Sequence, residues 1–458
     1  MSNEKIQIFD KKQKWAFGMG SFAQWFINGA FNTWVFSFYF TAVKLNVLYI
    51  MLAYIIWTIW NAINDPLIGY LSDRTNTKMG RRKPYILIGT IPVLIIEIIV
   101  WIPPMGNDIL QFVYLLIMLM CYDTFYTMVA LPYDSLFPEL YSSNEERAEV
   151  NTIKQILATL GLLVAFLIPA FVIEDLTDPS GYVINGVVTS IIVGLSLVIS
   201  IKFGVKERKE FKQDHIHQFS FFEGLKYTFK NKGFVLYTGM FFLFEYLLLL
   251  LGTVIPLWGR EILNSSPFMT AILLGLVFIV GILTVIIWKK LDLKLGSRKA
   301  YAISLVVYII ASIPLLFITD YTSAIFICSF MGVGFGGQLY FVYLIIADVI
   351  DEDEIKTGVR REGTFFGITN FFMRLAMVIT IVTVSLVFTG AEWETYQPNP
   401  GVDVLLGLRL LMVLFPALAN GVTLLCLYFY PYPKEKVDEI KKQMAEIHEK
   451  KIKNFQSR

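Results

Sequence analysis

Apolar runs of about 20 residues recur along this chain, separated by short segments with charge, proline or glycine. A bilayer core is about 30 Å thick and requires helices of that length, so each run is predicted to cross a membrane. Twelve spans are expected, at 14–42, 47–71, 84–103, 109–132, 150–173, 182–203, 233–257, 268–290, 299–319, 322–347, 364–389 and 404–429. The pattern predicts an all-α membrane protein with twelve transmembrane helices.

The spans form two six-helix halves that repeat a cytoplasmic charge pattern. Residues 73–83 after the second span are echoed by 292–299 after the eighth, and both segments place a glycine before basic residues. The acidic and basic residues of 138–147 recur in 348–362. Transporters built from structural repeats hold their substrate between the repeats, near the membrane midplane. The expected divisions are a first half at 1–203, a linker at 204–232, a second half at 233–430 and a tail at 431–458.

The linker and the tail are each expected to contain a helix outside the bilayer core. The linker mixes aromatic residues with lysines, which is typical of a helix that lies in the cytoplasmic interface. In the tail, apolar residues recur at helical spacing among lysine and glutamate, at Val437, Ile440, Met444 and Ile447. That spacing predicts an amphipathic helix that packs on the protein or on the membrane.

Lysine and arginine gather in alternate loops and thereby set the orientation of the spans. Basic residues follow the even-numbered spans, whereas the other loops carry acidic residues and few basic ones. Loops rich in Lys and Arg stay cytoplasmic, so both termini are expected there, in a multi-pass protein of the cell membrane. The first span follows several lysines and lacks a small-residue cleavage site, so it is expected to be an uncleaved helix.

Composition narrows the function further. Of the 458 residues, 56% are hydrophobic and 17% are charged, and the net charge is +2. The basic residues lie in loops, so no nucleic acid is expected as a partner. No nucleophile–base pair or phosphate-binding loop indicates an enzyme. The expected partners are the lipid bilayer, a small-molecule substrate and a coupling cation, with the chain as a monomer and without a cofactor.

Asp65 has the clearest chemistry, because it lies inside the second apolar span. A carboxylate at the centre of a membrane helix costs about 3 kcal/mol on insertion scales, so such a residue usually binds something. Asn61, Asn64 and Asp65 occupy positions i, i+3 and i+4 and share one helix face. Carboxylate and amide oxygens suit a hard monovalent cation, and a carboxylate alone can carry a proton. This face is predicted to hold the coupling cation.

The fourth span carries a second polar stripe, formed at steps of four, three and four by Asp123, Thr127, Ala130 and Asp134. A threonine hydroxyl one turn from an aspartate can complete a cage of oxygen ligands. Two other interpretations stay open. Asp123 could form a hydrogen bond between helices, and Asp134 could cap a helix that Pro132 breaks. Asp123 and Thr127 therefore join the cation site as candidates.

Basic and aromatic residues within the spans are candidates for substrate binding. Arg374 lies about ten residues into the eleventh span, too deep to reach the interface easily, so pairing with a carboxylate or an anionic substrate is favoured. Lys154 lies about one turn into the fifth span, where it could bind or only extend to the interface. Trp25 could stack on a sugar or pack against lipid. Glu97 and Glu245 also lie within spans and could be protonated packing residues.

Charged residues at the cytoplasmic helix ends are predicted to form a gate. Asp73, Arg81 and Arg82 are expected to pair with acids of neighbouring helix ends in the outward-facing state and to separate in the inward-facing state. Basic loops that only orient the helices would leave the same pattern. The expected gate residues are Asp73, Arg81, Arg82, Glu139, Arg147, Asp348 and Asp351.

Three segments carry motifs that are more specific than hydropathy. They run from Ile63 to Pro84, from Leu131 to Leu140 and from Ala347 to Gly363. They resemble the glycoside–pentoside–hexuronide:cation symporter family, which includes the melibiose carrier, and the match spans the chain. The resemblance implies a major facilitator fold with alternating access between two halves. It also implies symport of a glycoside, pentoside or hexuronide with H+ or Na+.

The resemblance implies roles for single residues. Asp65 matches a cation-site carboxylate of the family, Asn64 an amide near it and Thr127 a hydroxyl ligand, and these three would bind Na+ if sodium is the coupling ion. Arg374 matches a basic residue of the eleventh span. Lys154 approximately matches a residue of the fifth span that contacts sugar.

The cation site departs from that of the melibiose carrier at one position. Asn61 stands where that carrier has a second cation-binding aspartate, so the second span offers one negative charge. A single carboxylate slightly favours H+ over Na+. Asp123 could supply the missing acid and restore a Na+ site.

The substrate site departs further. Ala130 and Asp134 stand where the melibiose carrier has an aspartate and a tryptophan that hold galactoside, and Gln24 and Trp25 belong to a segment that replaces a basic–acidic pair. Melibiose-type recognition is therefore not expected. The candidate substrate-binding residues are Arg374, Lys154, Asp134, Trp25 and Gln24.

Two other functions stay open. One is transport of a lipid-like or other amphiphilic substrate, because related eukaryotic carriers resemble this family and the sugar-binding residues are lost. The other is a non-transporting sensor or assembly factor, since a fold alone does not determine function. Asp65 with Asn64 and Thr127 argues against the second, because a passive scaffold does not need a buried acid.

Overall fold

The computed structural model describes residues 9–75, 77–104, 106–141, 144–205, 231–357 and 362–443. In this part of the chain the regular secondary structure is helical, apart from an isolated bridge between Thr77 and Gly80. The residues form two compact units, and segments 266–271 and 394–397 belong to the first unit. The predictions that fall outside the described residues are the linker helix over 206–230 and the tail residues Met444 and Ile447.

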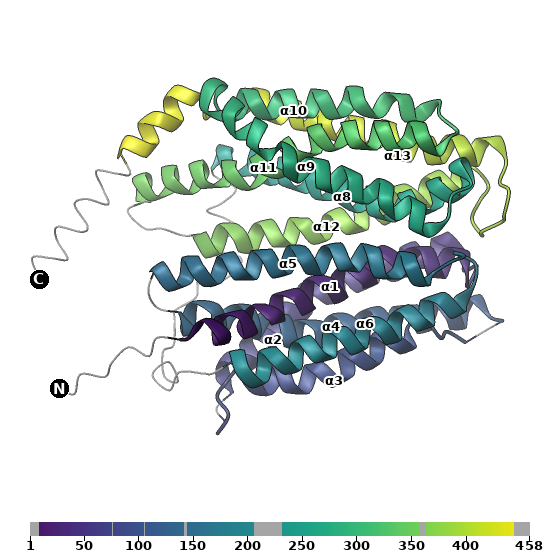
Figure 1. Ribbon diagram of the computed structural model, residues 1–458, viewed down its shortest axis with the longest axis horizontal. Coiled ribbons are helices and arrows are strands. Elements are labelled where there is room, and N and C mark those ends of the chain that lie inside the picture. Colours follow the sequence, from purple (N-terminus) through teal and green to yellow (C-terminus); the bar gives the residue numbers. More distant parts are fainter. Residues whose placement is uncertain are drawn as a thin grey trace, which may run out of the picture. The chain divides into compact units, whose positions relative to one another are not determined.

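Helices account for both units (Figure 1). The first unit contains α1 (Lys11–Thr41), α2 (Val47–Arg74), α3 (Lys83–Ile99), α4 (Asp108–Leu140), α5 (Asn144–Val172), α6 (Pro179–Ile199) and the short π-helix η1 (Ser200–Gly204). The second is built mainly from α8 (Lys232–Leu263), α9 (Pro267–Leu295), α10 (Ser297–Ser312), the 3-10 helix η3 (Ile313–Leu316), α11 (Tyr321–Thr357), α12 (Glu362–Gly390) and α13 (Val402–Phe429).

Ten helices of the described chain are long and apolar enough to cross a membrane. The expectation of an all-α protein with many membrane-spanning helices is therefore confirmed. The remaining two long helices are α1 and α3. The first contains several Lys, Gln and Asn residues, and the second has 17 residues. That these two helices also cross the membrane stays a prediction.

Side-chain caps explain where several helices begin. Asp10, Asn46 and Asn107 each accept a hydrogen bond from a backbone amide in the first turn of α1, α2 and α4. Such N-caps contribute about 1 kcal/mol of stability. Asp178 caps α6 in the same way, and the hydrogen bonds from Ser180 lower the pKa of its carboxyl group.

The prediction that Pro132 breaks the fourth helix is wrong, because α4 continues unbroken to Leu140. Proline is tolerated in a membrane helix where the freed backbone groups find other partners or the helix adjusts locally. Asp134 therefore lies within the helix and does not cap its end.

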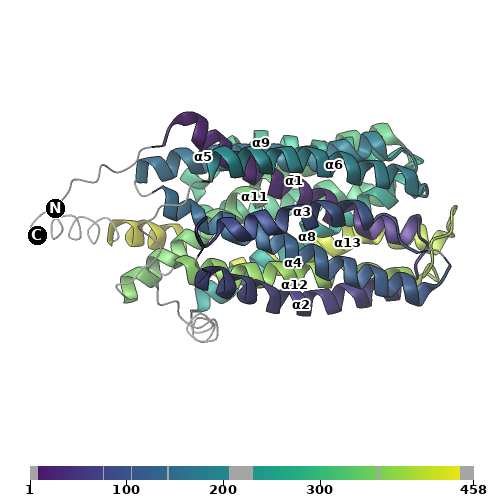
Figure 2. The same cartoon turned by 90° about the horizontal axis from the view of Figure 1, so that it is seen from below.

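In the first unit, α1 packs along α5 and α6, and α4 lies between α2 and α3 (Figure 2). The contact between α1 and α5 requires a glycine at position 161, because a Cβ atom there would overlap the carbonyl oxygen of Phe22. The contact between α2 and α4 brings the two predicted polar stripes face to face.

In the second unit, the segment after α13 is docked on the end of α11. Val437 and Ile440 are buried in a helix over 434–443. The hydroxyl group of Tyr432 donates to a carboxylate oxygen of Glu352 at 2.6 Å, and the ammonium of Lys436 lies 2.8 Å from the other oxygen. These contacts attach the tail to the body of this unit.

We expect Tyr432→Ala to lower the unfolding temperature, because the side chain is 2% exposed and packs against Tyr430 and Gly233. Truncating a buried aromatic residue costs about 3–5 kcal/mol in soluble cores. Tyr428→Ala is the matched control, since Tyr428 is 71% exposed. Thermal unfolding of both variants in detergent measures the difference, and equal shifts would contradict the docking of the tail.

Candidate cation and substrate site

Two polar contacts join α2 to α4 at the predicted cation site. Asp123 accepts hydrogen bonds from the side-chain amides of Asn61 and Asn64, the latter at 2.9 Å. Thr127 donates to Asp65 at 2.9 Å. The two contacts lie about one helical turn apart, because Asp123 and Thr127 are separated by about one turn on α4. All five residues proposed for this site from the sequence therefore come together.

Three of the five residues between α2 and α4 are buried, whereas Asn61 and Asp65 are half-buried. Asn64 is fully buried, and Asp123 and Thr127 are 4% and 5% exposed. Within the described chain, the side-chain oxygen of Asn64 has no hydrogen-bond partner. A buried carboxylate is costly unless a partner balances its charge. The two carboxylates, one amide oxygen and one hydroxyl group of this site can supply ligands to a small cation.

One contact of this interface was not predicted. The indole N–H of Trp60 donates to the hydroxyl group of Thr124 at 3.0 Å. Trp60 precedes Asn61, and Thr124 follows Asp123, so this bond fixes the register of the two helices beside the cation site. The sequence signal is weak, because tryptophan in a membrane helix is most often an interfacial residue.

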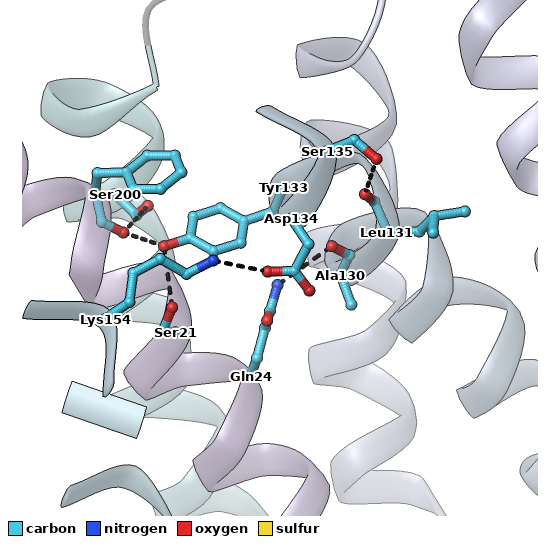
Figure 3. A network of polar contacts seen from close by, with 10 residues as sticks. Ser21, Gln24, Ala130, Leu131, Tyr133, Asp134, Ser135, Lys154 and Ser200 are labelled. Atoms are coloured by element: carbon cyan, nitrogen blue, oxygen red, sulfur yellow. Dashed lines mark hydrogen bonds and ion pairs between the residues drawn. The ribbon is translucent and has the colours of Figure 1, made fainter. Parts of the chain in front are cut away.

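A second polar cluster involves α1, α4 and α5 (Figure 3). The ammonium of Lys154 lies 3.0 Å from a carboxylate oxygen of Asp134. It lies 5.2 Å from the ring centre of Tyr133 and 4.9 Å from that of Phe137, which is close enough for cation–π attraction. Because α5 begins at Asn144, Lys154 lies well inside the helix. The apolar span of this helix begins at Glu149, so Lys154 lies about one turn into the span, as the sequence predicted. That Lys154 binds substrate stays a prediction.

Gln24 of α1 adds an amide to this cluster, which we call the Lys154 cluster (Lys154, Asp134, Tyr133, Phe137 and Gln24). Figure 3 shows its side chain directed at α4, where it donates to the Ala130 carbonyl group. Trp25 is 49% exposed, and the described contacts do not connect it to the cluster. The structure thus brings together Gln24, Asp134 and Lys154. Of the substrate residues predicted in the first unit, only Trp25 lies outside this group.

The other predicted substrate residue belongs to the second unit. Arg374 lies on α12 and is partly buried. In the same unit, Glu245 is 6% exposed and accepts a hydrogen bond from the hydroxyl group of Tyr343 at 3.4 Å. Substrate binding by Arg374 stays a prediction.

The predicted gate also stays a prediction. The side chains that fall outside the described residues are those of Asp73, Glu139 and Arg147. Arg81 and Arg82 belong to the first unit, and Arg82 is 8% exposed. Asp348 and Asp351 lie on α11 in the second unit, because this helix continues ten residues past its expected end at 347.

The fold and these sites define a multi-pass membrane transporter of the major facilitator type. A family model described as "MFS/sugar transport protein" matches residues 16–434, and the chain belongs to this family. The predicted resemblance to a symporter family is thereby confirmed. The expectation that the chain is a transporter and not an enzyme is also confirmed, because the family and its structural neighbours are transporters.

Curated relatives match nearly the whole chain. An uncharacterized symporter of Bacillus subtilis, YnaJ, is 24% identical over an alignment of 465 positions that covers 97% of this chain and 96% of the relative. The isoprimeverose transporter of Lactiplantibacillus pentosus is 22% identical and covers 96% of this chain and 91% of its own length. The sodium-dependent lysophosphatidylcholine symporter 1-B of Danio rerio is 22% identical, over 86% of this chain and 82% of its own length.

Solved structures show the same fold. The nucleoside transporter NupG superimposes with a TM-score of 0.69 at 14% identity, covering 92% of this chain and 99% of its own. A D-xylose–proton symporter superimposes with a TM-score of 0.63 at 13% identity, covering 90% of this chain and 96% of its own. Both likenesses concern the fold alone.

Proposed function

We propose that this protein is a cation-coupled symporter that moves a small polar solute of the glycoside, pentoside or hexuronide class by alternating access. The observation that carries the proposal is the contact of α2 with α4. There Thr127 donates a hydrogen bond to Asp65, and about one turn away Asn64 donates one to Asp123. A scaffold without transport activity does not need carboxylates within membrane helices. Relatives that are themselves named symporters support the coupling to a cation.

Na+ is the coupling ion that this site supports better. The second span alone favoured H+, because it offers one carboxylate, but Asp123 adds a second negative charge about one turn from Asp65. Na+ also needs several oxygen ligands, and Thr127 and Asn64 supply neutral ones. A relative that is named a sodium-dependent symporter agrees with this choice. Uptake driven by a pH gradient in the absence of Na+ would favour H+ instead.

The Lys154 cluster supports a polar solute. Asp134 has a side chain that is 55% exposed and therefore open to a ligand, whereas that of Lys154 is 14% exposed. An ammonium, a carboxylate and an amide offer both donors and acceptors to sugar hydroxyl groups, and Lys154 can also pair with the carboxylate of a hexuronide. The family description and the isoprimeverose transporter among the relatives agree with a sugar.

An amphiphilic solute is the second candidate. It is favoured by the relatives that are named lysophosphatidylcholine symporters. A thermal-shift screen of the purified protein against sugars, uronides and lysophospholipids, with and without Na+, separates the two. A Na+-dependent shift with a sugar or uronide supports the proposal, a shift with lysophospholipids alone favours the second candidate, and no Na+-dependent shift with any solute counts against Na+ symport.

We expect Lys154→Gln to weaken binding of the solute found in that screen by about 10- to 100-fold. Hydrogen bonds to a charged group are worth about 1.5–3 kcal/mol, and glutamine keeps a polar side chain without the charge. Lys202→Gln, an exposed lysine of η1, is the matched control and should bind as the parent does. Isothermal titration measures the affinity of each variant for the solute. If Lys154→Gln binds as tightly as the parent, Lys154 does not belong to the substrate site.

We also place the protein in the cell membrane as a monomer with both termini cytoplasmic, an orientation that the basic loops support. A cysteine introduced at exposed Asp10 should react with a membrane-impermeant reagent only in inside-out vesicles. Labelling of this cysteine from the outside of intact cells would show that the orientation is the opposite one.

A further inference from the structure

Glu97 lies on α3 with its carboxyl group sealed inside the first unit. The residue is 0% exposed, and neither carboxyl oxygen has a hydrogen-bond partner in the described chain. Two residues of α6 share this state: Asn185 and Thr189 are both 0% exposed, and their side-chain polar atoms have no partner among the described residues either. Leaving such groups unsatisfied costs about 1–3 kcal/mol each.

These residues belong to one contact between α3 and α6. Gly186, the neighbour of Asn185, lies against α3 so closely that a Cβ atom there would be 2.6 Å from the Glu97 carbonyl oxygen. The same Cβ would be 2.7 Å from the indole nitrogen of Trp101. One turn further along α6, Ser190 donates to the carbonyl oxygen of Leu94 at 2.9 Å. Glu97 therefore lies on the stretch of α3 that faces 185–190.

Aromatic residues lie beside these groups. Tyr122 of α4 is 2% exposed, lies within electrostatic range of Glu97 and has a hydroxyl group without a partner in the described chain. Its ring stacks on Phe31 of α1, with ring centres 3.6 Å apart. Trp101 stacks on Tyr182 of α6 at 5.6 Å, and its indole N–H is also unpartnered among the described residues.

The charges around Glu97 decide which form of the carboxyl group is stable. Neither α4 nor α6 contains a lysine or arginine, and Lys83 lies at the opposite end of α3. Lys202 of η1, which follows α6 directly, is exposed. An ionised carboxylate without a counter-charge in an apolar interior is far more costly than a neutral acid. The neutral, protonated acid is therefore the less costly form here.

We propose that Glu97, Tyr122, Asn185 and Thr189 line a closed internal site that holds ordered water around a protonated Glu97 carboxyl group. Water fits this set of groups, because it can accept from the indole, phenol and hydroxyl donors and donate to the carboxyl and amide oxygens. Buried waters typically make about three such hydrogen bonds. A metal cation cannot accept a hydrogen bond, so the donors of Trp101 and Tyr122 would remain unsatisfied beside it. The site shares no residue with the proposed coupling site, although Tyr122 precedes Asp123 on α4, and the proposal does not depend on cation coupling.

Infrared spectroscopy of the purified protein tests the protonated state. The carbonyl stretch of a protonated carboxyl group is expected at neutral pH and should be lost in Glu97→Gln. Glu245→Gln, another buried glutamate in the second unit, is the control and should leave that component of the band in place. Persistence of the whole band in Glu97→Gln, or loss of ionised carboxylate absorption instead, would overturn the proposal.

Hydroxyl-radical footprinting of the unaltered protein tests for water, because internal water delivers radicals to buried side chains. Trp101 is expected to be labelled severalfold faster than Trp288, which is similarly buried at 2% exposure but donates its N–H to the Val333 carbonyl group at 2.8 Å. The double substitution Asn185→Leu with Thr189→Val should slow the labelling of Trp101. Equal labelling of both tryptophans would contradict bound water. Stabilisation by Na+ that is lost in Glu97→Gln would identify a metal-ion site instead.

Discussion

Asp65→Asn is expected to abolish the accumulation of solute in proteoliposomes driven by an inward Na+ gradient. The substitution removes the charge that holds the cation, whereas the amide oxygen of asparagine can still accept the hydrogen bond from Thr127. The variant should therefore unfold at a temperature close to that of the parent. Both quantities are measured on the same preparation, so a loss of transport is not confused with a loss of folding.

The matched control for this experiment is Asp178→Asn, an equivalent substitution at an exposed carboxylate that caps α6. Asparagine is as good an N-cap as aspartate, so this variant should accumulate solute as the parent does. If Asp65→Asn also accumulates solute normally, Asp65 is not the coupling carboxylate.

The second large effect is expected at Asp123. Na+ should raise the unfolding temperature of the parent, because a ligand that binds only the folded state stabilises it by about 2.7 kcal/mol at 100 times its dissociation constant. Asp123→Asn should lose this response, since one of the two negative charges at the site is gone. Asp123→Ala should also lower the stability without Na+, because the amides of Asn61 and Asn64 lose their acceptor.

Asp108→Asn is the control on the same helix, because Asp108 is exposed in the first turn of α4. It should keep the full response to Na+. If Na+ still raises the unfolding temperature of Asp123→Asn, Asp123 is not part of the ion site. A single carboxylate would then favour H+ as the coupling ion.

The two polar stripes of the proposed cation site could be predicted, because helical spacing alone decides which residues share a face. Asn61, Asn64 and Asp65 form one stripe of α2, and Asp123 and Thr127 form one stripe of α4. The partner of each residue could not be predicted in this way. It depends on the register between two helices, which the packing of many side chains sets.

The Lys154 cluster shows a second limit. Its geometry requires α4 to continue through Pro132, so that Tyr133 and Asp134 remain on a helix beside α5. A local rule for proline predicts a break at this point, whereas helices within a membrane often continue through a proline.

Glu97 shows a third limit. Its position within a span was evident, but its neighbours Asn185 and Thr189 are neutral residues that nothing in the sequence connects to it. Only the packing of α6 on α3 brings them together, through the close approach at Gly186. Neutral polar residues in a membrane helix therefore reveal their role only through their partners.

Equilibrium binding of radioactive sodium to the purified protein tests the proposed cation site most directly, because it requires no knowledge of the solute. The parent is expected to bind Na+ saturably, and Asp65→Asn is expected to lose that binding while Asp178→Asn keeps it. Absence of saturable binding to the parent, or unchanged binding to Asp65→Asn, would contradict a Na+ site between α2 and α4.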